Sequence, residues 1–561
     1  MKTYDAIVVG SGMTGGWAAK ELTEHGLETL VLEAGPMVTP ADYVEHVPPW
    51  EKKFRGLRDR KQQLERQPIQ KECYACDEWS GKFFVDDIDN PYTQAEGKPF
   101  LWLRGRHVAG RSIMWGRQVY RWSDLDFEGN LRDGIAVDWP IRYKDIEPWY
   151  DHVEEFIGIS GEKLGLPQLP DGKFLKPMDL NCGESMMRDV IAKHWGGERV
   201  LTIGRCAVLT ENHNGRAACH YCGYCERGCI TLSYFNSINA TLPAAQKTGK
   251  MTLRPDSVVH SLIYDKKKNR ISGVRVIDGT TMHAIEFHAR VVFLCASALE
   301  SARLLLNSAT PDLPDGLANS SGEVGHNIMD HIMGGGASGR IDAPADRNTV
   351  GRRPNGIYVP RFRNLTGGPK SKFLRGYGFQ GGAGRDGWWR GTDLPGFGAD
   401  WKKQLEGPGD WHMGFSGFGE CLPNHDNYLE IDKTRNDKWG VPVIRISVAY
   451  SDNERQLMED SSIAAAEMLA AAGARDISVG TEKDFSPPGK AIHEMGTCRM
   501  GRDPKTSVLN ANNQSWDIPN LFITDGACMT SSACQNPSIT YMALTARAAN
   551  FAVDAMKRNE L

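Results

Sequence analysis

The sequence has no strong excess of charge of either sign. Its 561 residues contain 66 Lys and Arg against 70 Asp and Glu, which gives a formal net charge of −4. Nucleic acids and anionic membranes are usually held by a basic surface. The composition therefore favours neither kind of partner, and we expect no nucleic-acid ligand.

Long apolar runs and a disulfide pattern are missing as well. The apolar candidates are short pieces such as residues 291–296, whereas about 18–20 consecutive apolar residues are needed to span a bilayer. Residues 1–9 enter such a piece without the charged and apolar segments of a leader peptide. The 13 cysteines are odd in number, and several, such as Cys295 and Cys498, have apolar neighbours, which indicates reduced thiols. We expect neither an integral membrane protein nor a disulfide framework.

Glycine, by contrast, is abundant, with 60 residues, which indicates many tight turns. Gly10, Gly12 and Gly15 form the pattern G-x-G-x-x-G between a predicted strand over 4–9 and a predicted helix over 17–25. In a βαβ unit this turn brings a dinucleotide pyrophosphate to the helix N-terminus, and an acid about 20 positions on, here Glu33, binds the ribose hydroxyls. FAD and NAD use the same turn, so the motif predicts a dinucleotide without choosing between them.

Four cysteines follow the spacing C-x2-C-x2-C-x3-C, at Cys219, Cys222, Cys225 and Cys229. This spacing is typical of an iron–sulfur cluster. Zinc accepts the same sulfur ligands, so structural zinc stays an alternative, as do free thiols. Ile230 stands where a proline usually follows the last cysteine, so three ligands with one spare thiol fit the sequence as well as four. A second C-x2-C, Cys73 and Cys76, is expected to be a packed, inert pair.

The rest of the chain predicts more α/β structure and one long irregular region. A second α/β stretch begins near residue 251 and enters a helix over 298–307, and a C-terminal helix is predicted over 538–556. Between 340 and 411 the sequence is rich in Gly, Arg and Trp. Irregular segments of that length tend to be cap or binding loops, and we expect the substrate to be recognised there.

Six segments together resemble the glucose–methanol–choline (GMC) oxidoreductases. They are RGRHVAGRS at 104–112, ASALES at 296–301, GHNIMDH at 325–331, HEMGTCRMG at 493–501, NLFITDG at 520–526 and NPS at 536–538. With the N-terminal glycine turn they cover the whole chain. The four cysteines narrow the resemblance to the bacterial iron–sulfur branch of FAD-dependent sugar dehydrogenases, such as glucoside 3-dehydrogenases and FAD glucose dehydrogenase catalytic subunits.

The resemblance implies an α/β fold with a Rossmann-like FAD-binding domain, an α+β substrate-binding cap domain and an iron–sulfur loop. The FAD-binding domain is expected over residues 1–45, 95–130, 231–335 and 486–561. The substrate-binding domain is expected over 131–200 and 336–485, and the iron–sulfur loop over 201–230.

The resemblance also implies how FAD lies. Its pyrophosphate would lie on Gly12 and Gly15, its ribose on Glu33 and its adenine near Val259. Its isoalloxazine end would lie against Arg111, Ser112, Asp525, Gly526, Asn536 and Pro537. Met114 stands where some relatives carry a histidine bonded to the flavin, and a thioether cannot form that bond. We therefore predict non-covalent FAD.

The implied chemistry is oxidation of one hydroxyl of a sugar or glycoside, with the C3 hydroxyl as a candidate. Hydride loss from the carbon requires a base on the hydroxyl, and a neutral histidine suits that task at pH 7. By resemblance we predict His493 as the base and Asn536 as its partner. The other fourteen histidines, including His326 and His331, are interpreted as structural. For the substrate we predict contacts from aromatic and polar residues within 339–424, because sugars present apolar faces with polar rims. These residues are Gln380, Trp388, Trp389, Glu420 and Asn424.

The electrons are expected to leave through the cluster, which the resemblance implies to be a 3Fe-4S rather than a 4Fe-4S centre. The acceptor would be a small subunit, a cytochrome c-type protein or both, and not oxygen. The alternative within enzymes is a polyol or aldonate dehydrogenase for sorbitol, gluconate or fructose. A distant alternative is a non-catalytic, zinc-stabilised binding protein. We expect a periplasmic location by co-export with a signal-bearing partner subunit, with the cytoplasm as the alternative.

Overall fold

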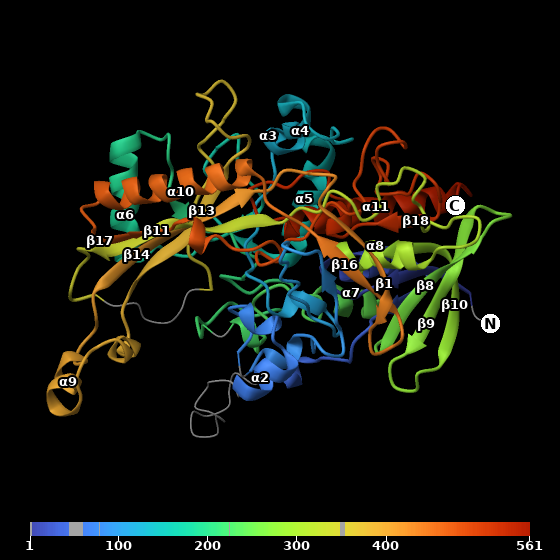
Figure 1. Ribbon diagram of the computed structural model, residues 1–561, viewed down its shortest axis with the longest axis horizontal. Coiled ribbons are helices and arrows are strands. Elements are labelled where there is room, and N and C mark those ends of the chain that lie inside the picture. The colour runs from blue at the N-terminus through green and yellow to red at the C-terminus, as the bar shows by residue number, and fades with distance from the viewer. Residues whose placement is uncertain (1–2, 44–59, 78, 224, 348–353) are drawn as a thin grey trace.

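The computed structural model describes residues 3–43, 60–77, 79–223, 225–347 and 354–561. Two large sheets organise the fold, and they lie at opposite ends of the long axis in Figure 1. The N-terminus and the C-terminus both lie at the end that carries the first sheet. The α/β class predicted from the sequence is confirmed.

The first sheet has seven strands, six of them in the order β7-β2-β1-β10-β9-β8. Pairing is parallel from β7 through β2 and β1 to β10, and β18 also joins β10 in parallel, whereas β9 and β8 are antiparallel. The strands are β1 (Thr3–Val9), β2 (Thr29–Leu32), β7 (Met251–Arg254), β8 (Ser257–Asp265), β9 (Arg270–Asp278), β10 (Ala284–Leu294) and β18 (Leu521–Ile523).

Helices cover both faces of this sheet, which explains why β1 is an almost unbroken apolar run. On one face Ala6 and Val8 pack with α1 (Met13–Glu24), α7 (Thr241–Lys247) and α11 (Ser538–Lys557). On the other, Ile7 and Val9 belong to the main core with α8 (Ala298–Asn307) and α5 (Tyr143–Ile157). The predicted N-terminal βαβ unit and both predicted helices, over 298–307 and 538–556, are confirmed within a few residues.

The second sheet is antiparallel throughout, in the order β17-β11-β14-β13-β12-β6. Helices α10 (Asp452–Ala471) and α6 (Cys182–Trp195) pack against it over a separate apolar core, and Figure 1 shows α10 across its upper face. The strands are β6 (Thr202–Ile203), β11 (His331–Ile341), β12 (Ile357–Val359), β13 (Tyr377–Arg385), β14 (Trp411–Glu420) and β17 (Arg475–Val479).

The prediction of one irregular region over 340–411 was wrong in part. Strands β12 and β13 lie within it, and helix α9 (Gly398–Gln404) projects from the body in both views. The glycines of β13 serve the sheet, since a Cβ at Gly381 would lie 2.0 Å from the carbonyl oxygen of Gly414 on the next strand. The glycine-rich sequence was predicted to be a loop, but in β13 the glycines are required by close contacts between strands.

Each large sheet, with the helices packed on it, forms one half of the molecule, and smaller elements join the two halves. Strands β15 (Tyr428–Asn436) and β16 (Pro442–Ser447) pair with β3 (Thr93–Gln94), and β4 (Ile159–Ser160) pairs with β5 (Phe174–Leu175). The remaining helices are α2 (Arg60–Arg66), α3 (Asp124–Phe127) and α4 (Gly129–Asp133). The domain division stays a prediction; β6, inside the expected iron–sulfur loop, pairs with β12 of the second sheet. Among the described helices, none has the length and apolarity that a membrane crossing needs.

Candidate active site

A cavity of about 730 Å³ lies where the two halves meet. Its walls come from the β1–α1 turn, the segment before and after η6 (Gly110–Ile113), the start of β8, the β10–α8 junction and the loops before β18 and α11. Met333 of β11, Gln380 of β13 and Phe418 of β14 reach the cavity from the second sheet. Most predicted cofactor residues therefore share one space with residues of the second sheet.

The glycine turn is shaped for a ligand at the N-terminus of α1. Gly10 has φ +97°, and a Cβ there would lie 2.3 Å from the carbonyl oxygen of Cys295. At Gly15 it would lie 1.9 Å from the Gly10 carbonyl, whereas at Gly12 the nearest atom is the Ala109 carbonyl at 3.9 Å. Among the described residues no side chain caps α1, so its first N–H groups are available to an anionic group. The turn fits a dinucleotide pyrophosphate.

Glu33 lies buried at the end of β2 on the cavity wall. It accepts hydrogen bonds from the Ser11 hydroxyl at 2.6 Å and from the Gly35 N–H at 3.0 Å. Burial raises the pKa of its carboxyl group. The Ser11 hydroxyl also accepts from the Ala109 N–H at 3.0 Å, which ties the glycine turn to the segment before Arg111. Ser11 was not among the predicted site residues, because the G-x-G-x-x-G pattern leaves its x positions unspecified.

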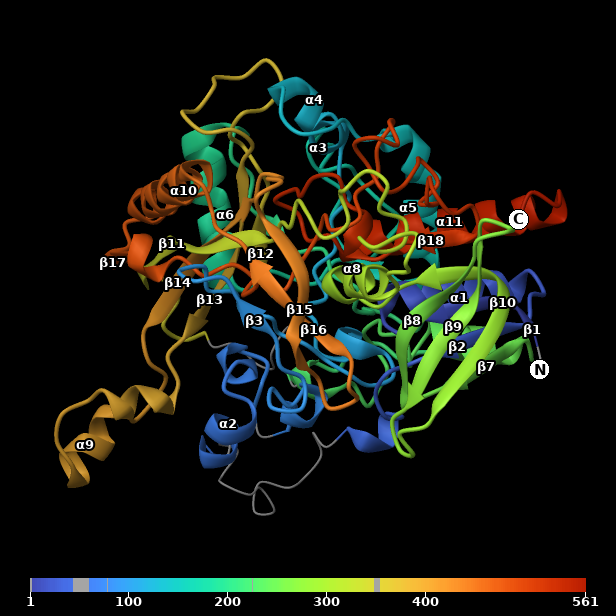
Figure 2. The same ribbon diagram turned by 45° about the vertical axis from the view of Figure 1, so that its right-hand side comes forward.

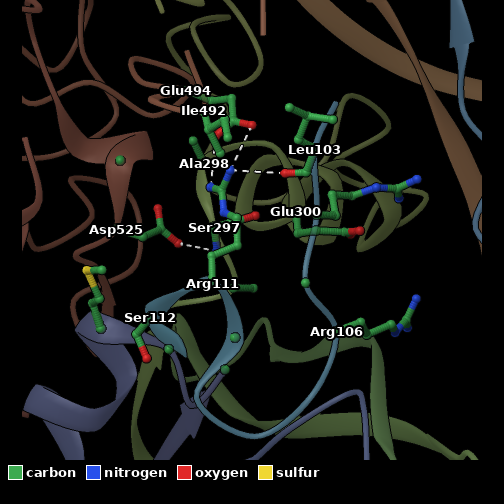
Figure 3. A pocket seen from close by; sticks show the side chains of 18 of the residues that line it. Leu103, Arg106, Arg111, Ser112, Ser297, Ala298, Glu300, Ile492, Glu494 and Asp525 are labelled. Atoms are coloured by element: carbon green, nitrogen blue, oxygen red, sulfur yellow. Dashed lines mark hydrogen bonds and ion pairs between the residues drawn. The ribbon is translucent and has the colours of Figure 1, made fainter. Parts of the chain in front are cut away.

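Arg111 is held at the cavity by two partners. Its guanidinium donates to both Glu494 oxygens, at 3.1 and 2.8 Å, and to the Leu103 carbonyl at 3.1 Å, as Figure 3 shows. The bidentate pair fixes the plane of the guanidinium. Glu494 directly follows His493, so this contact also anchors the loop that carries the predicted base.

The remaining predicted cofactor residues lie at the same cavity with one exception. Asp525 accepts from the Ser297 N–H at 3.0 Å, the Ser301 hydroxyl at 2.5 Å and the Ala527 N–H at 2.9 Å, and burial raises its pKa to about 6. Ser112, Val259 and Gly526 line the cavity. Pro537 forms the N-cap of α11 and is not among the lining residues, although its neighbours Asn536 and Ser538 are.

The loop that carries His493 is organised by one buried carboxylate. Asp330 accepts hydrogen bonds from the backbone N–H groups of Gly489 at 2.8 Å, Ala491 at 3.2 Å and His493 at 2.9 Å. Burial raises the pKa of Asp330 to about 7. The His493 ring lines the cavity, and burial lowers its pKa well below the usual value, so the ring is neutral at pH 7.

His493 contacts a second histidine. Its Nδ1 lies 3.0 Å from Nδ1 of His331, and no hydrogen bond to its Nε2 is found in the described part of the chain. His331 is fully buried at the start of β11. The interpretation of His331 as merely structural therefore overlooked a direct bond to the predicted base. The cue in the sequence was its place in the GHNIMDH segment.

Two predicted residues from different halves of the molecule meet at Asn536. The Gln380 amide donates from Nε2 to Oδ1 of Asn536 at 2.8 Å, and both residues line the cavity. The bond occupies the Asn536 oxygen, which leaves its NH2 group to donate elsewhere.

The other predicted substrate residues are not brought to the cavity. Glu420 is fully buried and pairs with Arg375 at 3.2 Å and with Arg361 at 3.8 Å, and it is not a lining residue. Asn424 is exposed in the turn before β15. The backbone of Trp388 and Trp389 forms η8 (Trp388–Thr392), but their side chains lie outside what the structure describes. Residue type alone does not distinguish an ion-pair partner such as Glu420 from a ligand contact.

Three of the four clustered cysteines share one apolar surface. Cys219, Cys225 and Cys229 pack against a buried group of Met178, Ile203, Cys206, Val208 and Tyr234, whereas Cys222 is exposed. Burial raises the pKa of Cys219 to about 11 and that of Cys225 to about 12. Within the described ranges, no group of three or more His, Cys, Asp or Glu side chains is arranged to hold a metal ion. Cys73 and Cys76 are both buried.

The segment after η6 separates the cysteines from the cavity. Trp115 lines the cavity and also packs against the apolar group that the cysteines share. Arg117 lines the cavity too, and its Nη2 lies 3.3 Å from Oε1 of Glu226, the residue after Cys225. A single wall of side chains thus contacts both places.

Comparisons with known proteins agree with this architecture. Two family profiles, both described as GMC oxidoreductase, match residues 4–333 and 423–545. A 2-methyl-1,2-propanediol dehydrogenase of Mycolicibacterium austroafricanum is 29% identical, over 98% of this chain and 94% of that protein. The fructose dehydrogenase large subunit of Gluconobacter japonicus is 25% identical, over 99% and 98%. The crystal structure of pyridoxine 4-oxidase from Mesorbium loti superposes with a TM-score of 0.60 at 18% identity, covering 98% of both chains.

Proposed function

The chain belongs to the GMC oxidoreductase family, FAD-dependent enzymes that act on sugar or alcohol-like hydroxyls, and we propose that it is a dehydrogenase that oxidises a hydroxyl of a sugar or glycoside. The oxidised position we propose is C3, which gives a 3-keto product. The observation that carries the proposal is that His493 and Asn536 line the same cavity as the glycine turn. The proposed base and the proposed hydroxyl-binding amide thus line one cavity with the turn proposed to hold the dinucleotide.

The residues present fit FAD. The open face of Gly12 and the uncapped N-terminus of α1 suit the pyrophosphate, and Glu33, which lines the same cavity, would bind the ribose. Met114 lines the cavity and cannot form a covalent bond to the flavin. The flavin is therefore expected in the supernatant after acid precipitation of the protein.

His493 supplies the base. A neutral imidazole accepts the hydroxyl proton on Nε2, so that the O–H bond breaks as the N–H bond forms. Bound FAD supplies the acceptor for the hydride that leaves the carbon. Asn536 can donate from its NH2 group to the substrate oxygen, and Gln380 holds the amide in that orientation. Phe418 and Met333 add apolar surface on which a C–H face of the substrate can rest.

Three of the four cysteines are proposed to be the ligands of a 3Fe-4S cluster, which would supply one-electron transfer from the flavin to an outside acceptor. Thiolates at this spacing are typical ligands of iron–sulfur clusters, and Cys219, Cys225 and Cys229 share one surface. Trp115 supports the relay because it contacts both that surface and the cavity. The acceptor would be a small subunit, a cytochrome c-type protein or both. The relative from Gluconobacter, a large subunit, supports a partner subunit, and with it we propose a periplasmic location.

A polyol or aldonate dehydrogenase is the second candidate. The 29% identical relative is a dehydrogenase of a branched diol, which favours a substrate without a pyranose ring. The zinc-stabilised binding protein remains the alternative in which the cavity holds no flavin.

A substrate panel tests the proposal. The holoprotein is mixed with glucose, methyl glucosides, a disaccharide, sorbitol, gluconate and 2-methyl-1,2-propanediol, with a dye acceptor in one series and oxygen in the other. Turnover of a glycoside with the dye, with a keto product at C3 by NMR, supports the proposal. Turnover of the open-chain alcohols alone favours the second candidate, and equal rates with oxygen favour an oxidase.

A further inference from the structure

The two buried histidines form a chain of hydrogen bonds that ends at a backbone carbonyl. Nδ1 of His493 lies 3.0 Å from Nδ1 of His331, and Nε2 of His331 contacts the carbonyl oxygen of Ala533. The two rings meet edge to face, with centroids 4.9 Å apart and planes at 80°. His331 opens β11, and Ala533 lies in the loop before α11, so three separate segments hold the chain in place.

The carbonyl group of Ala533, at the end of this chain of hydrogen bonds, fixes the donor and the acceptor in both bonds. A carbonyl oxygen can only accept, so Nε2 of His331 carries the hydrogen. A neutral imidazole has one donor and one acceptor nitrogen, which makes Nδ1 of His331 an acceptor. The bond between the rings therefore requires the hydrogen on Nδ1 of His493. Nε2 of a neutral His493 is then left unprotonated.

We infer that His331 is a positioning residue that fixes His493 in the tautomer whose Nε2 is free to accept a proton. The inference rests on the proposed function, in which His493 takes the hydroxyl proton. The ring nitrogen that carries a proton is set by the bond that the other nitrogen makes, and here a second histidine makes that bond. Without it, neutral His493 could carry its hydrogen on Nε2, where it cannot act as the base.

The surroundings support neutral rings. Burial lowers the pKa of His331 to about 4, and a protonated His331 would reverse the bond by donating from Nδ1. The charged groups facing His493 are Arg111, paired with Glu494, and Asp330, which accepts from its backbone N–H. Among described residues, no carboxylate bonds to a ring nitrogen of either histidine. The tautomer is therefore set by the two-ring chain and its terminal carbonyl.

The same chain serves the protonated state. When Nε2 of His493 takes the hydroxyl proton, the ring becomes a cation that donates from both nitrogens. Its Nδ1–H already points at the His331 lone pair, so the charge forms without a change of hydrogen-bond direction. No ring has to turn during the step.

The test uses the holoenzyme with three variants. His331→Phe removes the acceptor, and His331→Gln can restore a donor to Ala533 and an acceptor to His493. His326→Gln is the matched control, since His326 lies in the same segment and its Nδ1 bonds to a carbonyl, that of His425, away from the cavity. Anaerobic stopped-flow absorbance gives the rate of flavin reduction and the apparent substrate affinity across pH.

We expect His331→Phe to slow flavin reduction by roughly 10-fold to 10²-fold, less than the loss expected on removing the base itself, with little change in substrate affinity or flavin spectrum. His331→Gln should recover most of the rate, and its pH profile should keep the wild-type shape. Equal rates in His331→Phe and wild type would overturn the inference. So would equal losses in the Phe and Gln variants.

A second measurement needs no folded variant at position 331. Nitrogen-15 NMR of wild-type enzyme labelled in histidine, with the His493 signals assigned by comparison with His493→Ala, reports which ring nitrogen is protonated. A protonated Nδ1 and a bare Nε2 are expected, and the opposite pattern would overturn the inference. Normal flavin reduction by His493→Ala would instead remove the base from the proposed function, so the two failures are distinguishable.

Discussion

Gln380 donates a hydrogen bond from its side-chain nitrogen to Oδ1 of Asn536 over 2.8 Å. The two residues belong to β13 of the antiparallel sheet and to the loop before α11. The bond fixes which end of the Asn536 amide can reach a substrate, because the oxygen is occupied and the NH2 group is not. Under the proposed function, orientation of the substrate hydroxyl thus depends on contact between the two halves of the molecule.

Gln380→Leu should therefore impair catalysis through Asn536. Without its partner the amide can rotate, and we expect kcat/KM to fall by about 10-fold, the cost of one buried hydrogen bond of about 1.5 kcal/mol. Steady-state kinetics with the dye acceptor measure the change. Asn424→Leu, in an exposed turn, is the control and should keep the wild-type value. An unchanged kcat/KM in Gln380→Leu would show that Asn536 needs no anchor.

Two glycines of one turn should respond differently to alanine. A Cβ at Gly12 meets no atom nearer than 3.9 Å, so Gly12→Ala should fold normally but hold FAD more weakly, because the methyl group occupies space for the pyrophosphate. At Gly15 the Cβ would lie 1.9 Å from the Gly10 carbonyl, so Gly15→Ala should lower the melting temperature of the apoprotein itself. Flavin titration and thermal unfolding of the apoproteins separate the two effects. A Gly12→Ala protein with wild-type FAD affinity would argue against this site.

The three loop cysteines that share one surface test the proposed relay. Cys225→Ser should leave substrate reduction of the flavin unchanged while it lowers iron content and blocks electron delivery to a cytochrome c-type acceptor. Cys182→Ser, on α6 outside the loop, is the matched control. Iron analysis, electron paramagnetic resonance and stopped-flow flavin reduction report the three properties. If Cys222→Ser keeps the cluster signal, the ligands are the other three cysteines. If each of the four single variants keeps the signal, the proposal is contradicted.

Stability should fall in mild acid because of buried neutral histidines. Burial lowers the pKa of His107 to about 4, whereas an unfolded histidine titrates near 6.5. Between these values the unfolded chain binds more protons, so the free energy of unfolding decreases as pH falls. His107→Gln should flatten that decrease by up to about 1.4 kcal/mol per pH unit. Denaturant unfolding at several pH values checks this, with the exposed His283→Gln as control. Parallel curves for His107→Gln and wild type would contradict it.

The parts of the fold that could be predicted from the sequence are those with a local cause. The strand of β1, the glycine turn and helix α8 follow from apolar runs and from residues that only a tight turn requires. Cavity positions such as Asp525 were predicted through resemblance and not through local pattern. Strands of the second sheet were missed because their glycines are required by contacts with strands that are distant in the sequence.

Tertiary pairing also decided which polar residues reach the cavity. Glu420 and Gln380 were equivalent candidates for substrate contacts in the sequence. In the structure Glu420 forms an ion pair with Arg375, whereas Gln380 bonds to Asn536. His331 was interpreted as structural because its GHNIMDH segment, although part of the resemblance, does not reveal that β11 starts against the loop of His493. Such contacts depend on how distant segments pack, which a single sequence does not contain.

The most direct test of the central claim is anaerobic flavin reduction by His493→Ala. The variant should bind FAD with an unchanged spectrum, because the His493 ring is not part of the glycine turn proposed to hold the pyrophosphate. Substrate should reduce that flavin at least about 10² times more slowly than in wild type, the usual scale for loss of a general base. His326→Ala should behave as wild type. Reduction of the His493→Ala flavin at a near-wild-type rate would contradict the claim that His493 accepts the hydroxyl proton.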